Sequence, residues 1–378
     1  MENEYTQHRL RLYGDLSYSD WLRVYGEYLY ADSFGETLAP LPIDVDRGDL
    51  LNMFADVKLF EYQCKPVYAR GGRQELLYGS QRLISPLEWA NTRRTFDGVK
   101  VFRQGEKWDY DAFWVQPVIP NATNFDSPDE HQNLVGSWLT YRREKGEFLD
   151  FYYLALNNSN AVSQQGIVRA PFHNHTFGSR WAGDEDGWLW DFEGMLQIGE
   201  QNHSDLLAGA ATAGLGRNWK DAALTPTAWI YYDYASGDGD PTAGDAHTFN
   251  QLFAFGHYYM GWMDLIGRQN IHDVNAHLYL YPAPWITVWG QYHHFWLDQS
   301  TDALYNPAGV AYRRDPTGLS GNNVGDEIGL TLNFHLARYT DILVSYNKLY
   351  GGGFLAGTAG PAGAVDAESL YLMFGQRW

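Results

Sequence analysis

Apolar and polar residues alternate along this chain in runs of roughly ten residues, the length of a strand that crosses a bilayer. In the first run, Leu10, Leu12 and Leu16 take every second place, between Arg11 and Asp15. A period of two places the apolar residues on one face of a β-strand and the polar residues on the other. The pattern therefore predicts strands with one face toward an apolar medium and one toward polar surroundings.

The same alternation recurs from the start of the chain to its end. It predicts seventeen strands, near residues 5–18, 21–34, 49–60, 65–79, 93–104, 107–118, 133–143, 147–157, 173–181, 187–200, 204–218, 224–236, 265–281, 284–298, 325–336, 339–350 and 367–378. Inside the fourth run the alternation changes phase at Gly71–Gly72, which predicts a β-bulge there.

The connections between these strands alternate in length. Short ones are Ser19–Asp20, Glu61–Gln63, Gly105–Lys107, Glu144–Gly146, Pro282–Pro284 and His335–Arg338, and long ones are 35–48, 80–92, 119–132, 158–172, 237–264, 299–324 and 351–366. Short periplasmic turns and long outer loops are typical of transmembrane barrels, whereas a soluble sandwich has no reason to alternate loop length. We therefore expect an all-β fold, a transmembrane antiparallel up-and-down β-barrel formed by residues 1–378 as one domain.

The strand count bears on the ends of the chain. Bacterial single-chain barrels normally have an even number of strands. Because the first turn, Ser19–Asp20, is short, the strand before it enters from the outer side, and the last strand ends on the periplasmic side. The expectation is a barrel of about 18 strands whose first strand, outer loop and signal peptide precede Met1. A miscount by one strand is the alternative.

Composition fits a barrel but does not decide the matter. Hydrophobic residues make up 45% of the chain and aromatic residues 16%, yet the mean hydropathy is −0.42. No run approaches the roughly 20 apolar residues of a membrane helix. Tyr and Trp gather at the membrane interfaces of barrels, and the residues expected there are Trp21, Tyr28, Tyr30, Trp285, Trp289, Tyr292, Trp296 and Trp378. A soluble propeller or lectin can be equally aromatic.

Charge and cysteine content exclude other classes of protein. The net charge of −19 and the pI of 4.9 argue against nucleic acid as a partner. With Cys64 as the sole cysteine, the chain can form neither an internal disulfide nor a cysteine-based metal cage. The opening MENEYTQHRL lacks the basic and apolar regions of a signal peptide.

Several long stretches resemble the alginate export family of outer-membrane porins. They are GRQELLYG (Gly72–Gly79), WANTRRTFDGVKV (Trp89–Val101), FGHYYMGWMDLIGRQNIHDVN (Phe255–Asn275), LYLYPAPWITVWGQYHHFWLD (Leu278–Asp298), DALYNPAG (Asp302–Gly309), RRDPTG (Arg313–Gly318) and the ending LYLMFGQRW (Leu370–Trp378). The resemblance covers most of the chain from about Leu10 onward. It implies a monomeric 18-stranded barrel in the bacterial outer membrane, in contact with lipid and lipopolysaccharide, whose charged pore passes an acidic polysaccharide outwards.

Charged residues in the middle of a strand should line the lumen, because Arg or Lys facing mid-bilayer costs about 2–4 kcal/mol. The expected pore-lining and substrate residues are Arg9, Arg11, Arg23, Lys58, Arg70, Arg73, Arg94, Lys100, Arg142 and Arg180, with Asp15, Glu27, Asp56, Glu75, Asp97, Asp191, Glu193 and Asp233. Guanidinium groups suit a uronate polymer because each offers a planar fork to a carboxylate. Alternatively, the same charges pair across neighbouring strands and only stiffen the wall. Glu327 is expected inward as well.

The leading function from sequence is therefore passive passage of an anionic polysaccharide such as alginate, or of other anionic solutes, with no catalytic residue, cofactor or metal. A general porin for small hydrophilic solutes is the first alternative. The second is a soluble β-protein that binds or cleaves carbohydrate, in which Asp191 and Glu193 would act as a glycosidase pair. The acidic GDGDP segment (Gly237–Pro241) could bind Ca²⁺, or be an ordinary acidic outer loop. His272, His277 and the pair His293–His294 lack metal-ligand spacing and are expected in the lumen or at the interfaces.

Overall fold

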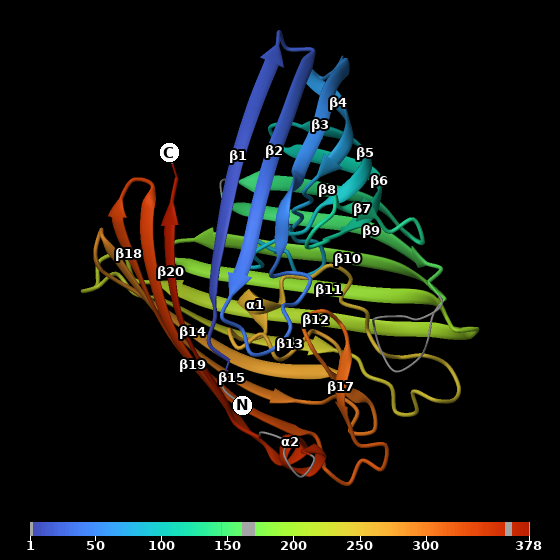
Figure 1. Ribbon diagram of the computed structural model, residues 1–378, viewed down its shortest axis with the longest axis vertical. Helices are drawn as coiled ribbons and strands as arrows, with labels where there is room; N and C mark the ends of the chain where they lie inside the picture. Colours follow the sequence, from blue (N-terminus) through green and yellow to red (C-terminus); the bar gives the residue numbers. More distant parts are fainter. Residues whose placement is uncertain (1–2, 145, 161–170, 360–364, 378) are drawn as a thin grey trace.

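The computed structural model describes residues 3–144, 146–160, 171–359 and 365–377. Seventeen long strands form the wall (Figure 1): β1 (Thr6–Tyr18), β2 (Leu22–Phe34), β3 (Asp46–Tyr62), β4 (Lys65–Gln74), β5 (Phe96–Gln104), β6 (Trp108–Ile119), β8 (Gln132–Glu144), β9 (Glu147–Asn158), β10 (Phe172–Glu185), β11 (Trp188–Gln201), β12 (Ser204–Asn218), β13 (Thr227–Ala235), β14 (Ile271–Ala283), β15 (Ile286–Trp296), β18 (Asn323–Ala337), β19 (Thr340–Gly351) and β20 (Ala367–Gln376).

Smaller elements lie in the connections. These are β7 (Ser127–Pro128), the hairpin of β16 (Ala303–Tyr305) and β17 (Ala311–Arg314), and two short helices, α1 (Gly256–Tyr259) and α2 (Gly353–Thr358). Among the residues described, no helix has the length and apolar character needed to cross a membrane. All seventeen expected strands are present, so the all-β expectation is confirmed.

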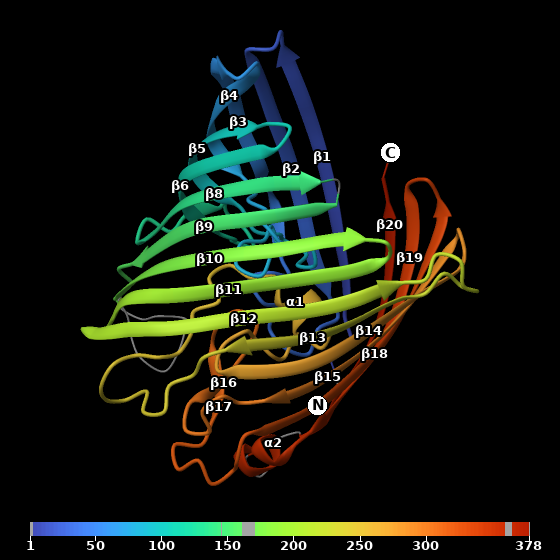
Figure 2. The same cartoon turned by 180° about the vertical axis from the view of Figure 1, so that it is seen from behind.

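Each wall strand pairs antiparallel with the next, from β1 to β20, and the sheet curves round on itself (Figures 1 and 2). Within the described residues no ladder of backbone hydrogen bonds joins β1 to β20. The arrows of these two strands point the same way in Figure 1. Among the described residues, β1 and β20 are therefore the two edge strands of the curved sheet, and they run parallel to each other.

The fourth expected strand and the expected bulge need correction. β4 ends at Gln74 rather than near residue 79, and residues 75–95 leave the wall. The register runs unbroken through Gly71 and Gly72, which face Ala55 and Phe54. Gly72 instead has a φ of +126°, and the register shift of the β3–β4 pair lies between Lys58 and Phe60. The phase change in the sequence thus reflects the left-handed backbone of Gly72 and the end of the strand.

Connection length divides the barrel into a short-turn end and a long-loop end. The three-residue turn Ser19–Trp21 and two-residue turns such as Gln63–Cys64 and Asp186–Gly187 lie at the short-turn end, although residues 219–226 form a longer connection there. At the long-loop end the β11–β12 connection is only Asn202–His203. The expected alternation therefore holds with two exceptions.

Two long loops fold to the concave side of the sheet, where Figures 1 and 2 place α1 between β1–β2 and β11–β13. These inner loops are residues 75–95 and 236–270. They pair with each other, because the N–H of Phe253 donates to the carbonyl of Leu83 (2.9 Å) and the N–H of Ser85 to the carbonyl of Phe253 (3.0 Å). The lumen thus contains folded backbone rather than a simple open bore.

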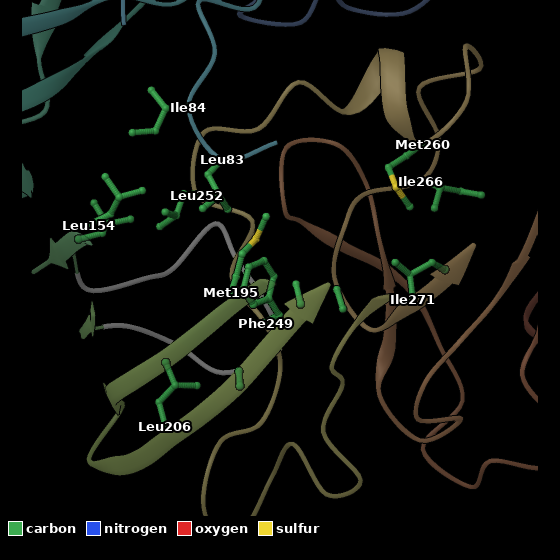
Figure 3. Packing of buried hydrophobic residues seen from close by; sticks show 14 of the residues in the cluster. Leu83, Ile84, Leu154, Met195, Leu206, Phe249, Leu252, Met260, Ile266 and Ile271 are labelled. Atoms are coloured by element: carbon green, nitrogen blue, oxygen red, sulfur yellow. The ribbon is translucent and has the colours of Figure 1, made fainter. Parts of the chain in front are cut away.

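Apolar side chains of the inner loops pack on the wall to form a core inside the barrel (Figure 3). Leu83 and Ile84 come from the first loop, and Phe249 and Leu252 from the second. Wall residues such as Met195 complete the cluster, which extends over β5, β6, β8–β15, β18 and β19. Burying one such side chain stabilises the fold by about 1.5–3 kcal/mol. This packing fixes the inner loops against one side of the lumen.

The expected interfacial aromatics divide between the two faces. Trp21, Tyr28, Trp285 and Tyr292 are exposed, as rings facing lipid would be. The expectation that Trp289 lies at the membrane interface is wrong, because this residue is buried and packs on Tyr279, on the lumen side of β15. The parity of the strand explains this, since Trp289 shares a face with Gln291 and His293. Trp378 lies outside the described residues.

Candidate functional site

A ladder of ion pairs crosses β1–β4 on the lumen face. The Nε of Arg11 donates to Glu27 (2.6 Å). Arg23 contacts Asp15 (2.8 Å) and Asp56 (3.4 Å). Asp56 also accepts two hydrogen bonds from Arg70, at 2.6 and 2.9 Å. Cation and carboxylate thus alternate from strand to strand.

The ladder continues round the wall as separate pairs. Lys100 on β5 lies 3.2 Å from Asp111 on β6, and Arg142 on β8 pairs with Asp109. Arg180 on β10 lies 2.7 Å from Asp191. The guanidinium of Arg70 also stacks 3.7 Å above the ring of Phe54. Such pairs hold the cations in defined positions.

Two of the expected cations lie near the ends of the barrel. Lys58 pairs with Asp20 (2.6 Å) and Glu61 (2.8 Å) at the short-turn end. Arg9 pairs with Glu88 of the first inner loop (3.1 Å) and donates to the carbonyl of Ala90 (2.9 Å). Arg9 therefore ties β1 to that loop.

Four expected residues stand apart from the ladder. Arg73 and Asp97 form a two-bond pair (2.9 and 3.0 Å). Arg73 pairs in register with Met53 of β3, and Asp97 lies two residues before Val99 on β5; Met53 and Val99 are both exposed on the outer face. Glu75 and Arg94 lie in the first inner loop rather than on strands.

Arg94 is enclosed by protein and holds the two inner loops together. It donates to the carbonyls of Phe253 (2.5 Å) and Ala254 (3.3 Å). Burial lowers the pKa of Arg94 to about 10. Glu75 pairs within the same loop with Arg93. Both residues hold the loop in place.

The acidic residues of the later strands are met by arginines from the inner loops. Arg82 lies 2.9 Å from Asp191 and 3.1 Å from Glu193. Arg268 lies 2.7 Å from Asp233. All five side chains are buried. A buried carboxylate without a partner is costly, so these pairs anchor the loops to the wall.

Sequence reasoning missed Arg82 and Arg268. A signal was present, because β11 and β13 carry inward acids with no inward cation on the strands beside them except Arg180. The excess implied a counter-charge from outside the wall. Both arginines lie in loops, where alternation gives no orientation.

Histidines strengthen the same region. His293 Nδ1 lies 2.8 Å from Asp273 on the neighbouring strand. Glu327 on β18 accepts the backbone N–H of Met263 (3.0 Å) from the second inner loop. His257 of α1 lies 2.6 Å from Asp264. Glu327 thus joins the wall to the second loop, while the two histidine contacts lie within the wall and within the loop.

A cavity of about 320 Å³ lies between α1 and the wall. It reaches toward the short-turn end and is lined by Gly146, Phe148, Arg180, Ala182, Gly183, Asp184, Trp190, Asp191, Trp229, Tyr231, Asp233, Tyr258, Tyr259, Asn275, His277 and Tyr279. Three expected residues, Arg180, Asp191 and Asp233, border it. Aromatic rings make up much of the remaining lining.

The described residues contain one carboxylate group with the spacing of a metal site. Oxygens of Asp46, Asp49 and Asp126 lie within 4.8 Å of one another. Arg73 lies 3.6 Å from Asp49 and donates to the carbonyl of Asp126, so this group already has a positive partner and forms an ion-pair network. In GDGDP, Asp238 accepts the backbone N–H groups of Asp240 (2.9 Å) and His247 (3.2 Å), as a turn-stabilising residue does.

Solved outer-membrane proteins share this fold. OccD3 (OpdP) of Pseudomonas aeruginosa superposes with a TM-score of 0.62 at 13% identity, covering 99% of this chain and 86% of that one. OccK7 (OpdD) of the same species gives 0.60 at 11%, covering 99% and 92%. The outer membrane protein OprD from Pseudomonas aeruginosa gives 0.56 at 10%, covering 99% and 91%. At such identities the likeness concerns the fold.

The family comparison is more specific. No curated protein sequence matches the chain significantly. The family model for alginate export matches residues 1–364. Family and structural neighbours are channels rather than enzymes. The chain therefore belongs to the alginate export family and is an outer-membrane β-barrel channel.

Proposed function

We propose that this channel passes an acidic saccharide chain, such as a polyuronate, or other anionic solutes, by passive diffusion along the ladder of β1–β5. The observation that carries the proposal is the set Arg11, Arg23, Arg70 and Lys100, which β1, β2, β4 and β5 hold on one face, with Asp56 of β3 between them. The proposal includes a monomeric barrel, as the family resemblance implies.

The position of the inner loops supports this path. Apart from Phe96, the first residue of β5, the buried wall residues of their apolar core lie on β6, β8–β15, β18 and β19. The other buried apolar cluster comprises only Leu29, Ala31 and Leu51, all on β2 and β3. Arg11 and Arg23 keep about a third of their side-chain surface exposed. The ladder side therefore offers charged groups that a solute can reach.

The pairing of the ladder suits passage rather than capture. A substrate carboxylate must compete with Asp15 and Asp56 for Arg23. When the carboxylate leaves, the protein acid takes its place, so no buried charge is left unpaired. Each contact is consequently weak and exchangeable, and several in series guide the chain.

The same pairing favours a second candidate, a general porin for small hydrophilic solutes. Arg11, Arg23, Arg70 and Lys100 each have an acidic partner within 3.5 Å. A lumen whose charges are locally balanced selects weakly between anions and cations. Ion selectivity therefore separates the two candidates.

Planar-bilayer recording tests the proposal. We expect anion selectivity under a KCl gradient and block of the current by oligouronates. The double variant Arg23→Gln/Arg70→Gln should shift the reversal potential toward cations and weaken the block. Arg143→Gln is the matched control, since this exposed arginine lies beside the short turn after β8. A weakly selective current that oligouronates leave unchanged would favour the general porin.

A further inference from the structure

Aromatic rings surround the cavity between α1 and the wall. Trp229 and Tyr231 come from β13, Tyr279 from β14 and Tyr258 from α1. All four keep exposed surface although they lie inside the barrel. We call these four residues the aromatic subsite. None of the four belongs to the apolar core that holds the inner loops.

Glycines on the neighbouring strand let two of the rings lie flat on the wall. A Cβ added at Gly214 would lie 2.1 Å from Cε1 of Tyr231, and one at Gly216 would lie 2.6 Å from Cδ2 of Trp229. The two rings are also nearly parallel, at 16° with centroids 5.0 Å apart. Each of these two rings therefore lies against the backbone of a glycine and also borders the cavity.

Polar groups at the rim of the cavity can form hydrogen bonds with the hydroxyl groups of a ligand. The hydroxyls of Tyr258 and Tyr279 lie 3.0 Å apart, and each can both donate and accept. Arg180 uses its Nε for Asp191 (2.7 Å), which leaves further N–H donors beside the cavity.

The two buried acids of the cavity, Asp191 and Asp233, do not make it a site for cations, and the third acid of the lining, Asp184, is exposed at the short-turn end. Arg180 and Arg82 neutralise Asp191, and Arg268 neutralises Asp233. A cationic ligand would find aromatic faces but no unpaired carboxylate among these two acids. A wholly apolar ligand would leave the rim polar groups without partners. The class of ligand that remains is a flat ring whose faces carry apolar C–H groups and whose edges carry hydroxyl groups.

We propose that the aromatic subsite binds one pyranose ring of the passing chain, by stacking on Trp229 and Tyr231 and by hydrogen bonds from its hydroxyls to the rim. This inference rests on the proposed function and deepens it, because it assigns a sugar-face site that is separate from the charged ladder. The axial C–H groups of a pyranose carry partial positive charge and are attracted to an aromatic face. Apolar walls with a few placed polar groups are typical of small-molecule sites.

The location suits an outgoing chain. Gly146 and Asp184, beside turns of the short-turn end, also line the cavity. Short turns face the periplasm in such barrels. A saccharide that enters from the periplasm would therefore meet the aromatic subsite before it passes the inner loops.

Two matched oligosaccharides separate ring stacking from charge. Hexamannuronate and β-1,4-linked mannohexaose have the same ring geometry and linkage but differ in the carboxylate. In single-channel recordings of the full chain, Trp229→Leu should shorten the block dwell time of both roughly two- to tenfold, as expected for loss of one stacking contact. Arg23→Gln/Arg70→Gln should affect hexamannuronate only. Trp114→Leu, which removes a tryptophan exposed on the outer face, should change neither.

The outcomes distinguish the two proposals. If Trp229→Leu leaves both dwell times unchanged while the ladder variant weakens the hexamannuronate block, the subsite is refuted and the anionic channel stands. If mannohexaose blocks in a Trp229-dependent manner and hexamannuronate blocks no better, the subsite stands and the anionic preference fails. Should Trp229→Leu not fold, titration of the natural chain decides: mannohexaose must change the tryptophan fluorescence, and no change refutes the subsite.

Discussion

Arg82 reaches from the first inner loop to Asp191 on the wall, with Nη1 2.9 Å from Oδ2, although 109 residues separate the two in sequence. The guanidinium is fully buried, and the side chain of Asp191 is 7% exposed. A contact of this kind couples the position of the loop to the charge state of the wall. It is one of the contacts that hold the first inner loop inside the lumen.

Replacing Arg82 by methionine should therefore loosen the inner loop. The substitution leaves Asp191 with Arg180 alone and Glu193 with only hydroxyl partners. Breaking a buried pair from one side costs about 3–5 kcal/mol. We expect a lower midpoint of heat-dependent gel migration and a larger, noisier single-channel conductance.

Two variants accompany that experiment. Lys107→Met, at an exposed turn, should alter neither quantity. Arg82→Met/Glu193→Gln should recover part of the lost stability, since it removes one of the stranded charges. An unchanged conductance in Arg82→Met would contradict the role assigned to this pair.

The strands could be predicted from sequence because a barrel wall enforces strict alternation. Leu10 and Leu12 must face lipid and Arg11 must not, so the alternation is visible in the amino-acid sequence. The inner loops obey no such period. The alternation predicts that Arg94 lies on a strand, because its neighbours continue the pattern. In the structure Arg94 instead donates a hydrogen bond to a carbonyl of the second inner loop. Arg82 and Arg268 act through Asp191 and Asp233, partners that are distant in sequence, and no local pattern encodes such contacts.

Gly72 and Gly71 should respond very differently to alanine. Gly72 has a φ of +126°, and a Cβ there would lie 2.2 Å from the carbonyl oxygen of Met53. A Cβ at Gly71 meets nothing within 4 Å. Gly72→Ala should lose at least about 1–3 kcal/mol through backbone strain, whereas Gly71→Ala should be nearly neutral. Urea unfolding of the refolded barrel measures both, and equal losses would refute the argument.

Substitution of Gly214 tests the aromatic subsite without removing any of its four aromatic side chains. Alanine at this position would push the ring of Tyr231 off the wall and into the cavity, because the added Cβ would lie 2.1 Å from the ring. Gly214→Ala should weaken block by mannohexaose while the barrel remains inserted. Gly194→Ala is the control, since its Cβ meets nothing within 4 Å. Equal block in the two variants would argue against the flat-ring arrangement.

Asp126, in the loop between β6 and β7, should make the barrel less stable as pH rises. Burial raises the pKa of Asp126 to about 6. The hydrogen bond from the Asn121 N–H and the charge of Arg73 lower this pKa, whereas the charge of Asp49 raises it further. In the unfolded chain the pKa is about 3.9. The folded state therefore holds the proton more tightly, so this stabilisation is complete below about pH 3.9 and is lost as pH rises through about 6.

Asp126→Asn removes this titration and keeps an oxygen that can accept the N–H of Asn121, which lies 2.6 Å from Asp126 Oδ1. The variant should be more stable than the natural chain at pH 8, and the difference should shrink toward pH 4. Thermal midpoints at both pH values measure the gap. Glu130→Gln, an exposed change in the next connection, between β7 and β8, should show no such dependence. A gap that widens toward acid would reverse the sign, and it would mean that Asp126 is stabilised as the carboxylate by Arg73.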